Sequence, residues 1–234
     1  MICDKTVSVI IPALNEGRAI GRVITDLPEC VDEVIVVDNG STDDTAEVAA
    51  KAGARVVKEE RRGYGAACMA GIAIASQSDL IAFIDGDYSD YPGELAAVME
   101  PVARDEVDLC IGSRPGAVDG RAVMPWHQRL GNWFLCRVVG VVHGYCYDDF
   151  GPMRCISRSV LEDLDMQDRN YGWTAEMQLK ACGMGARVEQ VQVGYRHRIG
   201  ESKISGTVKG SIFAGTKILF WIVKLAVNPV PQKS

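Results

Sequence analysis

The sequence lacks the short motifs that mark the common zinc and nucleotide-binding sites. Its three histidines lie far apart without an HExxH pattern, and none of its eight cysteines forms a CxxC pair, so we do not expect a zinc site. The patterns GxGxxG and GxxxxGK[ST] are also absent, which excludes the Rossmann and P-loop phosphate-binding loops. The N-terminal residues carry an acidic side chain and break at Pro12, unlike a signal peptide.

The composition is that of an ordinary folded protein. The 234 residues are 47% hydrophobic and 24% charged, which fits one large domain or one domain with an appendage. The cysteines are scattered, several of them in apolar runs such as VDLCIG. We therefore expect reduced, mostly buried thiols and a cytoplasmic protein.

Charge is distributed unevenly along the chain. The net charge is −6, yet between Arg196 and Lys224 six arginines and lysines stand against the single acidic residue Glu201. A basic segment on an acidic body favours a local anionic partner and argues against general nucleic-acid binding.

The first half alternates short Val/Ile-rich runs with helix-like stretches. The apolar runs lack strict alternation, as strands buried on both faces of a parallel sheet do; they are 7–11, 34–37, 54–57, 80–84 and 107–111. The stretches with helical patterns are 16–27, 43–52, 65–76 and 93–104. This repetition predicts an α/β fold with a doubly wound, mainly parallel sheet and helices on both faces.

The rhythm changes after Arg114. Residues 115–127 form a loop with Gly and Pro that is long enough to suggest a function. Helices are predicted over 128–142 and 173–183, and a strand over 188–193.

The last helical stretch, 211–227, is short and contains two lysines, which disfavours a membrane span. Lys209, Lys217 and Lys224 fall within a stripe of about 80° at 100° per residue. Either this amphipathic helix packs on its own domain or on a second subunit of a homodimer, or it rests on an anionic membrane surface. We divide the chain into a main domain, 1–205, and this C-terminal segment, 206–234.

Polar residues follow three of the predicted strands at their carboxyl ends. Ligands bind at this edge of an open parallel sheet. Asn15 and Glu16 follow the first strand, Asp38 follows the second, and Asp85-Gly86-Asp87 follows the fourth. The glycine allows a sharp turn, so both aspartates can face one point, and hard oxygen ligands of this kind suit Mg²⁺ or Mn²⁺.

Four segments, in this order and spacing, resemble those of the family 2 glycosyltransferases with the GT-A fold: VSVIIPALNEG, VIVVDNGSTDDT, RRGYGAA and FIDGDYSDYP. More narrowly, the chain is similar to the dolichyl- or polyprenyl-phosphate hexose synthases, over roughly residues 6–205. The resemblance implies a GT-A catalytic domain that binds a nucleotide-diphosphate sugar.

The resemblance also implies a donor site. Its residues are Pro12, Ala13, Asn15, Glu16, Asp38, Ser41, Arg62, Gly65, Asp85, Gly86 and Asp87. Asp85 and Asp87 would hold the divalent cation. Ser89 stands where relatives often carry a glutamine ligand; either Ser89 is a third, weaker metal ligand, or water or Asp90 takes that place.

On the acceptor side, the resemblance implies a mainly basic set of six residues: Arg114, Arg129, Asp148, Arg154, Ser202 and Lys203. The segment RIGESK, residues 198–203, resembles the family's closing pattern R-x-G-x-S-K, which implies a position near the donor diphosphate, where Lys203 would assist. The segment DDFGPMR departs from the family pattern D-x-x-x-G-F-R, because Pro152 and Met153 replace its glycine and phenylalanine. Glu176 occupies a helix carboxylate position and is either catalytic or paired with a basic neighbour.

The implied reaction is inverting, metal-dependent transfer of a hexose from UDP-glucose or GDP-mannose to a polyprenyl phosphate, on the cytoplasmic face of a membrane. Such a step would serve cell-envelope glycan synthesis. A phosphate acceptor is already anionic and needs no strong base. Transfer to a hydroxyl of a soluble or lipid acceptor would need one, with Glu176 or Asp148 as candidates. A third alternative is a nucleotide-sugar-binding protein without catalysis.

Overall fold

The computed structural model describes residues 1–75, 78–114, 126–200 and 208–231. Its strands are β1 (Val7–Ala13), β2 (Glu33–Asp38), β3 (Arg55–Lys58), β4 (Leu80–Phe83), β5 (Leu109–Ser113), β6 (Arg154–Ser157) and β7 (Val188–Gln192). Its helices are α1 (Ile20–Thr25), α2 (Thr45–Lys51), α3 (Tyr64–Ile74), the 3₁₀ turn η1 (Pro92–Glu94), α4 (Leu95–Ala103), α6 (Trp126–His143), α7 (Arg158–Asp163), α8 (Trp173–Gly183) and α9 (Val208–Val227).

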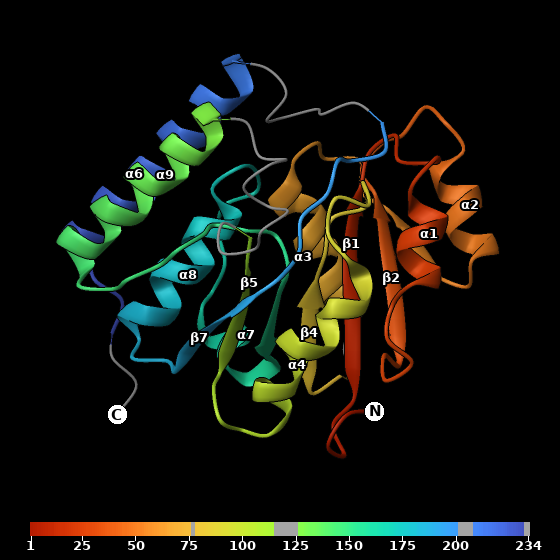
Figure 1. Ribbon diagram of the computed structural model, residues 1–234, viewed down its shortest axis with the longest axis horizontal. Helices are drawn as coiled ribbons and strands as arrows, with labels where there is room; N and C mark the ends of the chain where they lie inside the picture. Colours follow the sequence, from red (N-terminus) through yellow and green to blue (C-terminus); the bar gives the residue numbers. More distant parts are fainter. Residues whose placement is uncertain (76–77, 115–125, 201–207, 232–234) are drawn as a thin grey trace.

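The seven strands form one sheet in the order β3-β2-β1-β4-β6-β5-β7 (Figure 1). β1 pairs in parallel with β2 and β4, β2 with β3, and β5 with β7. Of these seven strands, only β6 runs antiparallel, to β4 and β5. The predicted α/β architecture with a mainly parallel sheet is confirmed.

The sequence pattern did not reveal β6 and α7. β6 has four residues and begins with an arginine, so it carries too little hydrophobic periodicity to be recognised. It forms because β4 and β5 flank it, which buries Cys155 and Ile156 completely. Of the predicted helices, 173–183 matches the bounds of α8, whereas 16–27 shortens to α1 at Ile20–Thr25.

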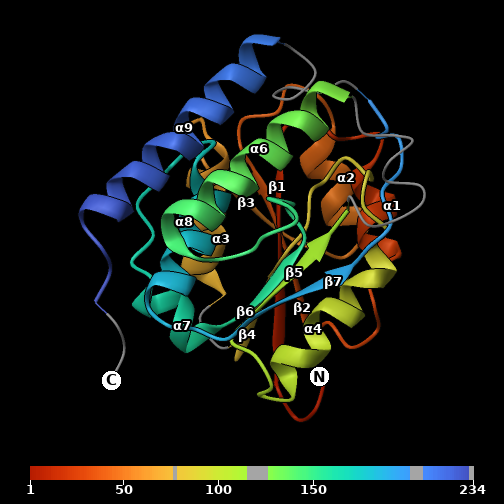
Figure 2. The same ribbon diagram turned by 60° about the vertical axis from the view of Figure 1, so that its left-hand side comes forward.

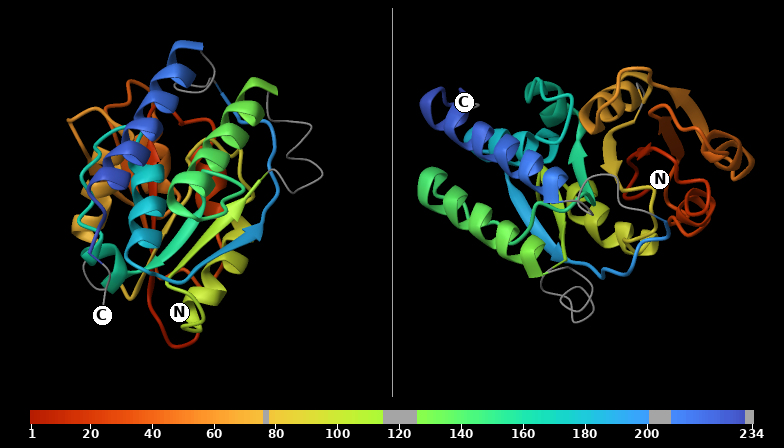
Figure 3. Two further views of the ribbon diagram at one scale, coloured as in Figure 1. Left: turned by 90° about the vertical axis from the view of Figure 1, so that its left-hand side faces the viewer. Right: turned by 90° about the horizontal axis from the view of Figure 1, so that it is seen from above.

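Successive residues of β1 supply the cores of two helical layers. Val9 and Ile11 belong to the core formed with α1, α2 and α4. Ile10 belongs to the core formed with α3 and α8 on the other face. Helices therefore cover both faces of the sheet (Figure 3), and the alternation of side chains along a strand accounts for both layers.

The C-terminal helix α9 packs lengthwise beside α6 and against α8 (Figure 2). Trp221, Ile222 and Leu225 are buried in the core that includes α3. Phe220 and Val223, by contrast, are 53% and 61% exposed. The proposed boundary between residues 205 and 206 lies outside the described residues. Within the described ranges, no helix has the length and apolarity needed to cross a membrane.

Candidate active site

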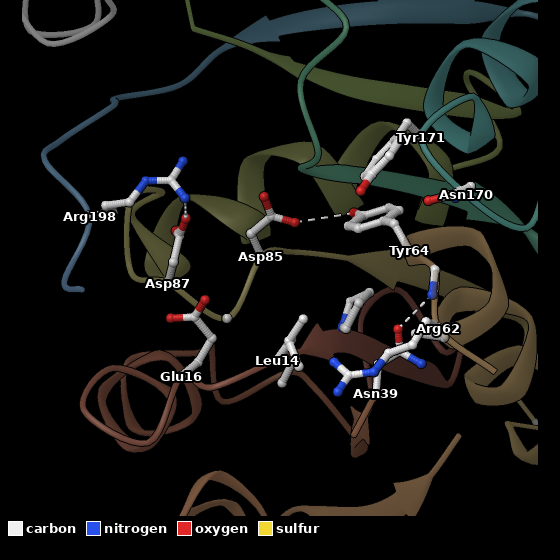
Figure 4. Close-up of a pocket in the computed structure, with 15 residues that line it drawn as sticks. Leu14, Glu16, Asn39, Arg62, Tyr64, Asp85, Asp87, Asn170, Tyr171 and Arg198 are labelled. Carbon is white, nitrogen blue, oxygen red and sulfur yellow. Dashed lines mark hydrogen bonds and ion pairs between the residues drawn. The ribbon is translucent and has the colours of Figure 1, made fainter. Parts of the chain in front are cut away.

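A pocket of about 380 Å³ opens at the carboxyl ends of β1 and β4. The chain order reverses between these two strands, since β2 and β3 lie on one side of β1 and β4 lies on the other. Open α/β sheets bind ligands at such a switch point. The pocket is lined by Pro12, Ala13, Leu14, Glu16, Asn39, Arg62, Gly63, Tyr64, Ala67, Asp85, Gly86, Asp87, Asn170, Tyr171 and Arg198 (Figure 4).

Asp85 and Asp87 face this pocket from the turn that follows β4. The Tyr64 hydroxyl donates to Oδ1 of Asp85 at 3.2 Å. Oδ2 of Asp87 pairs with Nη1 of Arg198 at 2.9 Å, while its Oδ1 accepts the backbone N–H of Ser89 at 2.9 Å. Burial, and next the charge of Asp87, raise the pKa of Asp85 to about 6. Repulsion between the two carboxylates contributes to this shift, and a bound cation would reduce that repulsion.

These carboxylates fit a divalent cation that is shared with a ligand. In the described parts of the chain, no three His, Cys, Asp or Glu side chains cluster closely enough to hold a metal ion by themselves. Mg²⁺ commonly binds one or two carboxylates together with substrate phosphates and water. Ser89 is buried and does not line the pocket, so its part in metal binding stays a prediction.

The residues after β1 and β2 form a hydrogen-bonded support beside the pocket. Oδ1 of Asn15 accepts the backbone N–H of Thr42 at 2.7 Å, and the Asn15 N–H donates to Oγ of Ser41 at 2.9 Å. Oδ1 of Asp38 in turn accepts the Ser41 N–H at 2.8 Å. Asn15, Asp38 and Ser41 are thus brought together but do not line the pocket, whereas Glu16 does.

Asn39 fastens the segment that carries Tyr64. Its Nδ2 donates to the carbonyls of Glu59 and Arg61 at 3.0 and 2.8 Å, and its Oδ1 accepts the N–H of Gly63 at 2.8 Å. Gly63 has a φ of 144°, a value that favours glycine. Neither Asn39 nor Tyr64 was predicted as a pocket residue, although Tyr64 lies in the RRGYGAA motif.

Asn170 and Tyr171 are further pocket residues that were not predicted from the sequence. Arg198, which also lines the pocket, begins the segment 198–203, whose resemblance to the family pattern R-x-G-x-S-K implies a position near the donor diphosphate. Asn170 and Tyr171 lie between α7 and α8, and nothing in their residue types marks them. They reach the pocket because the 168–172 turn packs on the start of α3, where the N–H of Ala66 donates to the Arg169 carbonyl at 2.9 Å.

Arg114 is held by a buried partner outside the pocket lining. Its Nε and Nη2 donate to the two carboxylate oxygens of Asp149 at 2.7 and 3.0 Å, and its guanidinium lies 5.0 Å from the ring centre of Tyr195. Burial alone would lower the pKa of Arg114, but Asp149 outweighs that effect and raises it. The acceptor roles of Arg114, of exposed Arg129 on α6 and of exposed Asp148 stay predictions.

Arg154 and Glu176 are buried and do not line the pocket. Arg154 is 1% exposed and donates to the carbonyls of Gly151, Pro152 and Thr174. Glu176 is fully buried, accepts the N–H groups of Gln167 and Asp168 at 2.9 and 2.6 Å, and pairs with Lys180 at 2.8 Å. Of its two predicted alternatives, the geometry favours pairing. Ser202 and Lys203 lie outside the described residues.

Asp90 is a buried carboxyl close to the DGD turn. It is 1% exposed, and neither of its oxygens has a hydrogen-bond partner among the described residues. Burial, and next the charge of Asp85, raise the pKa of Asp90 to about 8. The carboxyl is therefore mostly neutral at pH 7.

A family model for "Glycosyl transferase family 2" matches residues 8–165, which contain both aspartates of the DGD turn. An uncharacterized glycosyltransferase of Mycobacterium tuberculosis is 37% identical over 91% of this chain and 96% of its own length. The chain belongs to glycosyl transferase family 2. The present chain is also 32% identical to a dolichyl-phosphate hexose transferase of Haloferax volcanii, over 87% of this chain and 89% of that relative.

The chain described here has the GT-A fold of glucosyl-3-phosphoglycerate synthase from Mycobacterium tuberculosis. A crystal structure of that protein with Mg²⁺ and UDP superimposes with a TM-score of 0.73 at 25% identity, over 97% of this chain and 81% of the other. A second, with Mn²⁺, UDP and glucosyl-3-phosphoglycerate, gives 0.74 at 25% identity, over 97% and 82%. The family and fold expected from the four motifs are both confirmed.

Proposed function

We propose that this enzyme transfers a hexose, with inversion at the anomeric carbon, from UDP-glucose or GDP-mannose to a polyprenyl phosphate. The observation that carries the proposal is the pair Asp85 and Asp87, which face one pocket at the switch point of the sheet. Two relatives support it: the Haloferax volcanii protein is a dolichyl-phosphate hexose transferase, and the solved Mycobacterium tuberculosis synthase holds Mg²⁺ and UDP.

The donor would bind with its diphosphate at Asp85, Asp87 and Arg198. Mg²⁺ or Mn²⁺ held by the two carboxylates would supply positive charge against the negative charge that grows on the leaving nucleoside diphosphate. Arg198, already paired with Asp87, and Arg62 at the opposite end of the pocket would orient the donor. Lys203 is proposed to assist the diphosphate.

A phosphate acceptor agrees with the described part of the pocket lining, which contains neither of the two candidate bases, Glu176 and Asp148. Among the described residues, the carboxylates that line the pocket are Glu16, Asp85 and Asp87, all of which belong to the donor-side loops. Glu176 is engaged with two backbone amides and Lys180. A polyprenyl phosphate oxygen is already an anion, so positioning suffices. We propose that Arg114 and Arg129 hold it, with Asp149 orienting the Arg114 guanidinium.

A lipid acceptor requires access to a membrane, and the α6–α9 pair offers a suitable surface. Its exposed apolar side chains are Leu130, Trp133, Phe134, Val141 and Val142 of α6, and Leu219, Phe220, Val223 and Val227 of α9. Lys217 and Lys224 lie over the Phe220 ring, 5.6 and 6.0 Å from its centre. Apolar groups with interspersed cations fit an anionic lipid surface. We propose that the enzyme rests on the membrane through this surface. The alternative is that a second subunit of a homodimer covers the same surface.

The proposal is tested with a donor panel and a short polyprenyl phosphate, reading out released UDP or GDP with Mg²⁺ and with EDTA. We expect one donor to dominate, a requirement for the metal, and a glycosylated lipid phosphate in the mass spectrum. Hydrolysis of the donor without transfer to the lipid, or transfer only to hydroxyl compounds, would contradict the proposed acceptor.

A second candidate is transfer to a hydroxyl of a soluble acceptor. It is favoured by the likeness to the synthase that was crystallised with glucosyl-3-phosphoglycerate. Including 3-phosphoglycerate in the acceptor panel separates the two alternatives, because a hydroxyl acceptor would also impose a pH profile governed by a general base.

A further inference from the structure

The turn that carries Asn170 and Tyr171 into the pocket is organised around one carboxylate, that of Asp168. Its Oδ1 accepts the backbone N–H groups of Asn170 and Gly172 at 2.7 and 3.1 Å. The side chain is 2% exposed, so these bonds are shielded from water. The carboxylate therefore fixes the two residues at the tip of the turn from inside.

The other oxygen of Asp168 is held by the C-terminal helix. Nε1 of Trp221 donates to Oδ2 at 2.9 Å, and Nζ of Lys217 lies 3.4 Å from the same atom. Hydrogen bonds from Trp221 and from the turn, with the charge of Lys217, outweigh burial and lower the pKa of Asp168. Asp168 thus joins α9 to the 168–172 turn, although 53 residues separate it from Trp221.

The same turn is packed tightly on the start of α3. A Cβ added at Gly65 would lie 2.1 Å from the Asp168 carbonyl oxygen, and one added at Gly63 would lie 2.2 Å from that of Arg169. Only glycines allow this approach. Between them stands Tyr64, which donates to Asp85. Displacing the turn would therefore disturb the pocket wall on which Tyr64, Asn170 and Tyr171 lie side by side (Figure 4).

We propose that Asp168 is a positioning residue for donor binding: it holds the Asn170–Tyr171 wall in place by anchoring it to Trp221 and Lys217 of α9. The inference rests on the proposed function, in which the nucleotide sugar occupies this pocket. The wall lies at the end of the pocket away from Asp87, beside Asn39 and Arg62. It would contact the nucleoside rather than the metal-bound diphosphate, so its loss weakens donor binding more than the chemical step.

The test uses the full chain with the donor that the panel identifies, and compares Asp168→Asn with Trp221→Phe. Asparagine keeps an oxygen for the two turn amides but loses the charge, and phenylalanine keeps the ring but loses the N–H donor. We expect Asp168→Asn to raise the donor KM about tenfold and Trp221→Phe roughly fivefold, with kcat lowered less than about twofold, because each loses a buried hydrogen bond. The dissociation constants for UDP and GDP with Mg²⁺, from calorimetry, should rise in parallel for whichever nucleotide the wild type binds.

Lys51→Met on α2 is the control. Lys51 is exposed, pairs with Glu47 at 2.6 Å and does not line the pocket. We expect its donor KM to stay within about twofold of the wild-type value. If the melting temperature falls in Asp168→Asn and Trp221→Phe while donor KM and nucleotide affinity stay unchanged, the residue is only structural and the inference is wrong. A fall in kcat alone also overturns it.

The two proposals fail in different ways. A wild-type enzyme that neither binds nucleotide nor turns over any donor refutes the proposed function. If the wild-type enzyme binds nucleotide and turns over a donor, but the donor KM of Trp221→Phe equals the wild-type value, only the role of Asp168 is refuted. Should Asp168→Asn fold poorly, the Trp221→Phe and Lys217→Met variants decide the question, because each removes one contact of Asp168 and leaves the turn amides bonded.

Discussion

Nη1 of Arg198 lies 2.9 Å from Oδ2 of Asp87, so the pocket carries its own counter-charge for the second carboxylate of the DGD turn. The two residues come from opposite halves of the chain. The N–H of Ile199 also donates to the carbonyl of Asp87 at 2.9 Å, which fastens the segment after β7 to the turn after β4. This junction is where the donor diphosphate would bind.

Asp87→Asn should reduce transfer by about a thousandfold or more while leaving the protein folded. Asparagine can still accept the Ser89 N–H through its oxygen, but it lacks the charge needed to ligate a cation and to support the leaving group. The measurement is turnover with saturating Mg²⁺ or Mn²⁺, together with circular dichroism of the folded variant. Undiminished turnover would rule out a metal role for Asp87.

Arg198→Met should destabilise the metal-free protein and increase its response to metal. The substitution removes the ion-pair partner of Asp87, whose side chain is nearly buried. Because Arg198 is 26% exposed and solvent weakens the pair, we expect the free energy of unfolding to fall by only about 1–2 kcal/mol. Adding Mg²⁺ should then raise the melting temperature more than it does in the wild type. Arg62→Met, which removes a second pocket arginine, is the control and should show no such enhanced response.

Glu176→Gln distinguishes a structural carboxylate from a catalytic base. Because Glu176 holds the amides of Gln167 and Asp168, its loss should lower the free energy of unfolding by roughly 2 kcal/mol and should raise the donor KM. The turnover rate at saturating donor should stay within about threefold of the wild-type rate. If turnover instead falls by about a hundredfold or more and the pH profile loses its general-base dependence, Glu176 is a general base.

Asp90→Asn should change the pH dependence of stability, measured in EDTA. Burial raises the pKa of Asp90 from 3.8 to about 8, so its contribution to stability is complete below pH 3.8 and is lost as pH rises toward 8. Asparagine does not titrate. The variant should therefore gain stability relative to the wild type between pH 5 and pH 7, by at most about 2.7 kcal/mol. A difference that stays constant over this range would contradict the assignment.

Replacing exposed apolar residues of α9 tests the membrane surface without opening the core. Phe220→Ser combined with Val223→Ser should reduce cosedimentation with anionic liposomes several-fold, since both side chains are more than half exposed. Turnover of a water-soluble short-chain acceptor should be unaffected. If the variant instead shifts from dimer to monomer in light scattering while liposome binding persists, the surface is a subunit interface.

The strand–helix order was predictable from the sequence because it depends on local patterns. Val/Ile-rich runs predicted β1, β2 and β4, and the polar residues at their ends were placed correctly at the carboxyl edge of the sheet. The DGD turn was recognisable for the same reason: Gly86 stands between two acidic residues immediately after a buried strand. Four short motifs in order were enough to identify the family.

Tertiary structure decided which polar residues reach the pocket. By residue type Arg154 resembles an acceptor-binding arginine, and Glu176 a base, yet both are buried outside the pocket lining and hydrogen-bonded to backbone groups. Asn170 and Tyr171 carry no recognisable pattern and reach the pocket because their turn packs on the start of α3, about 100 residues earlier in the chain. The local sequence determines strands, turns and the types of ligand present, whereas burial and long-range hydrogen bonds, which depend on how distant segments pack, determine which side chains remain available to a substrate.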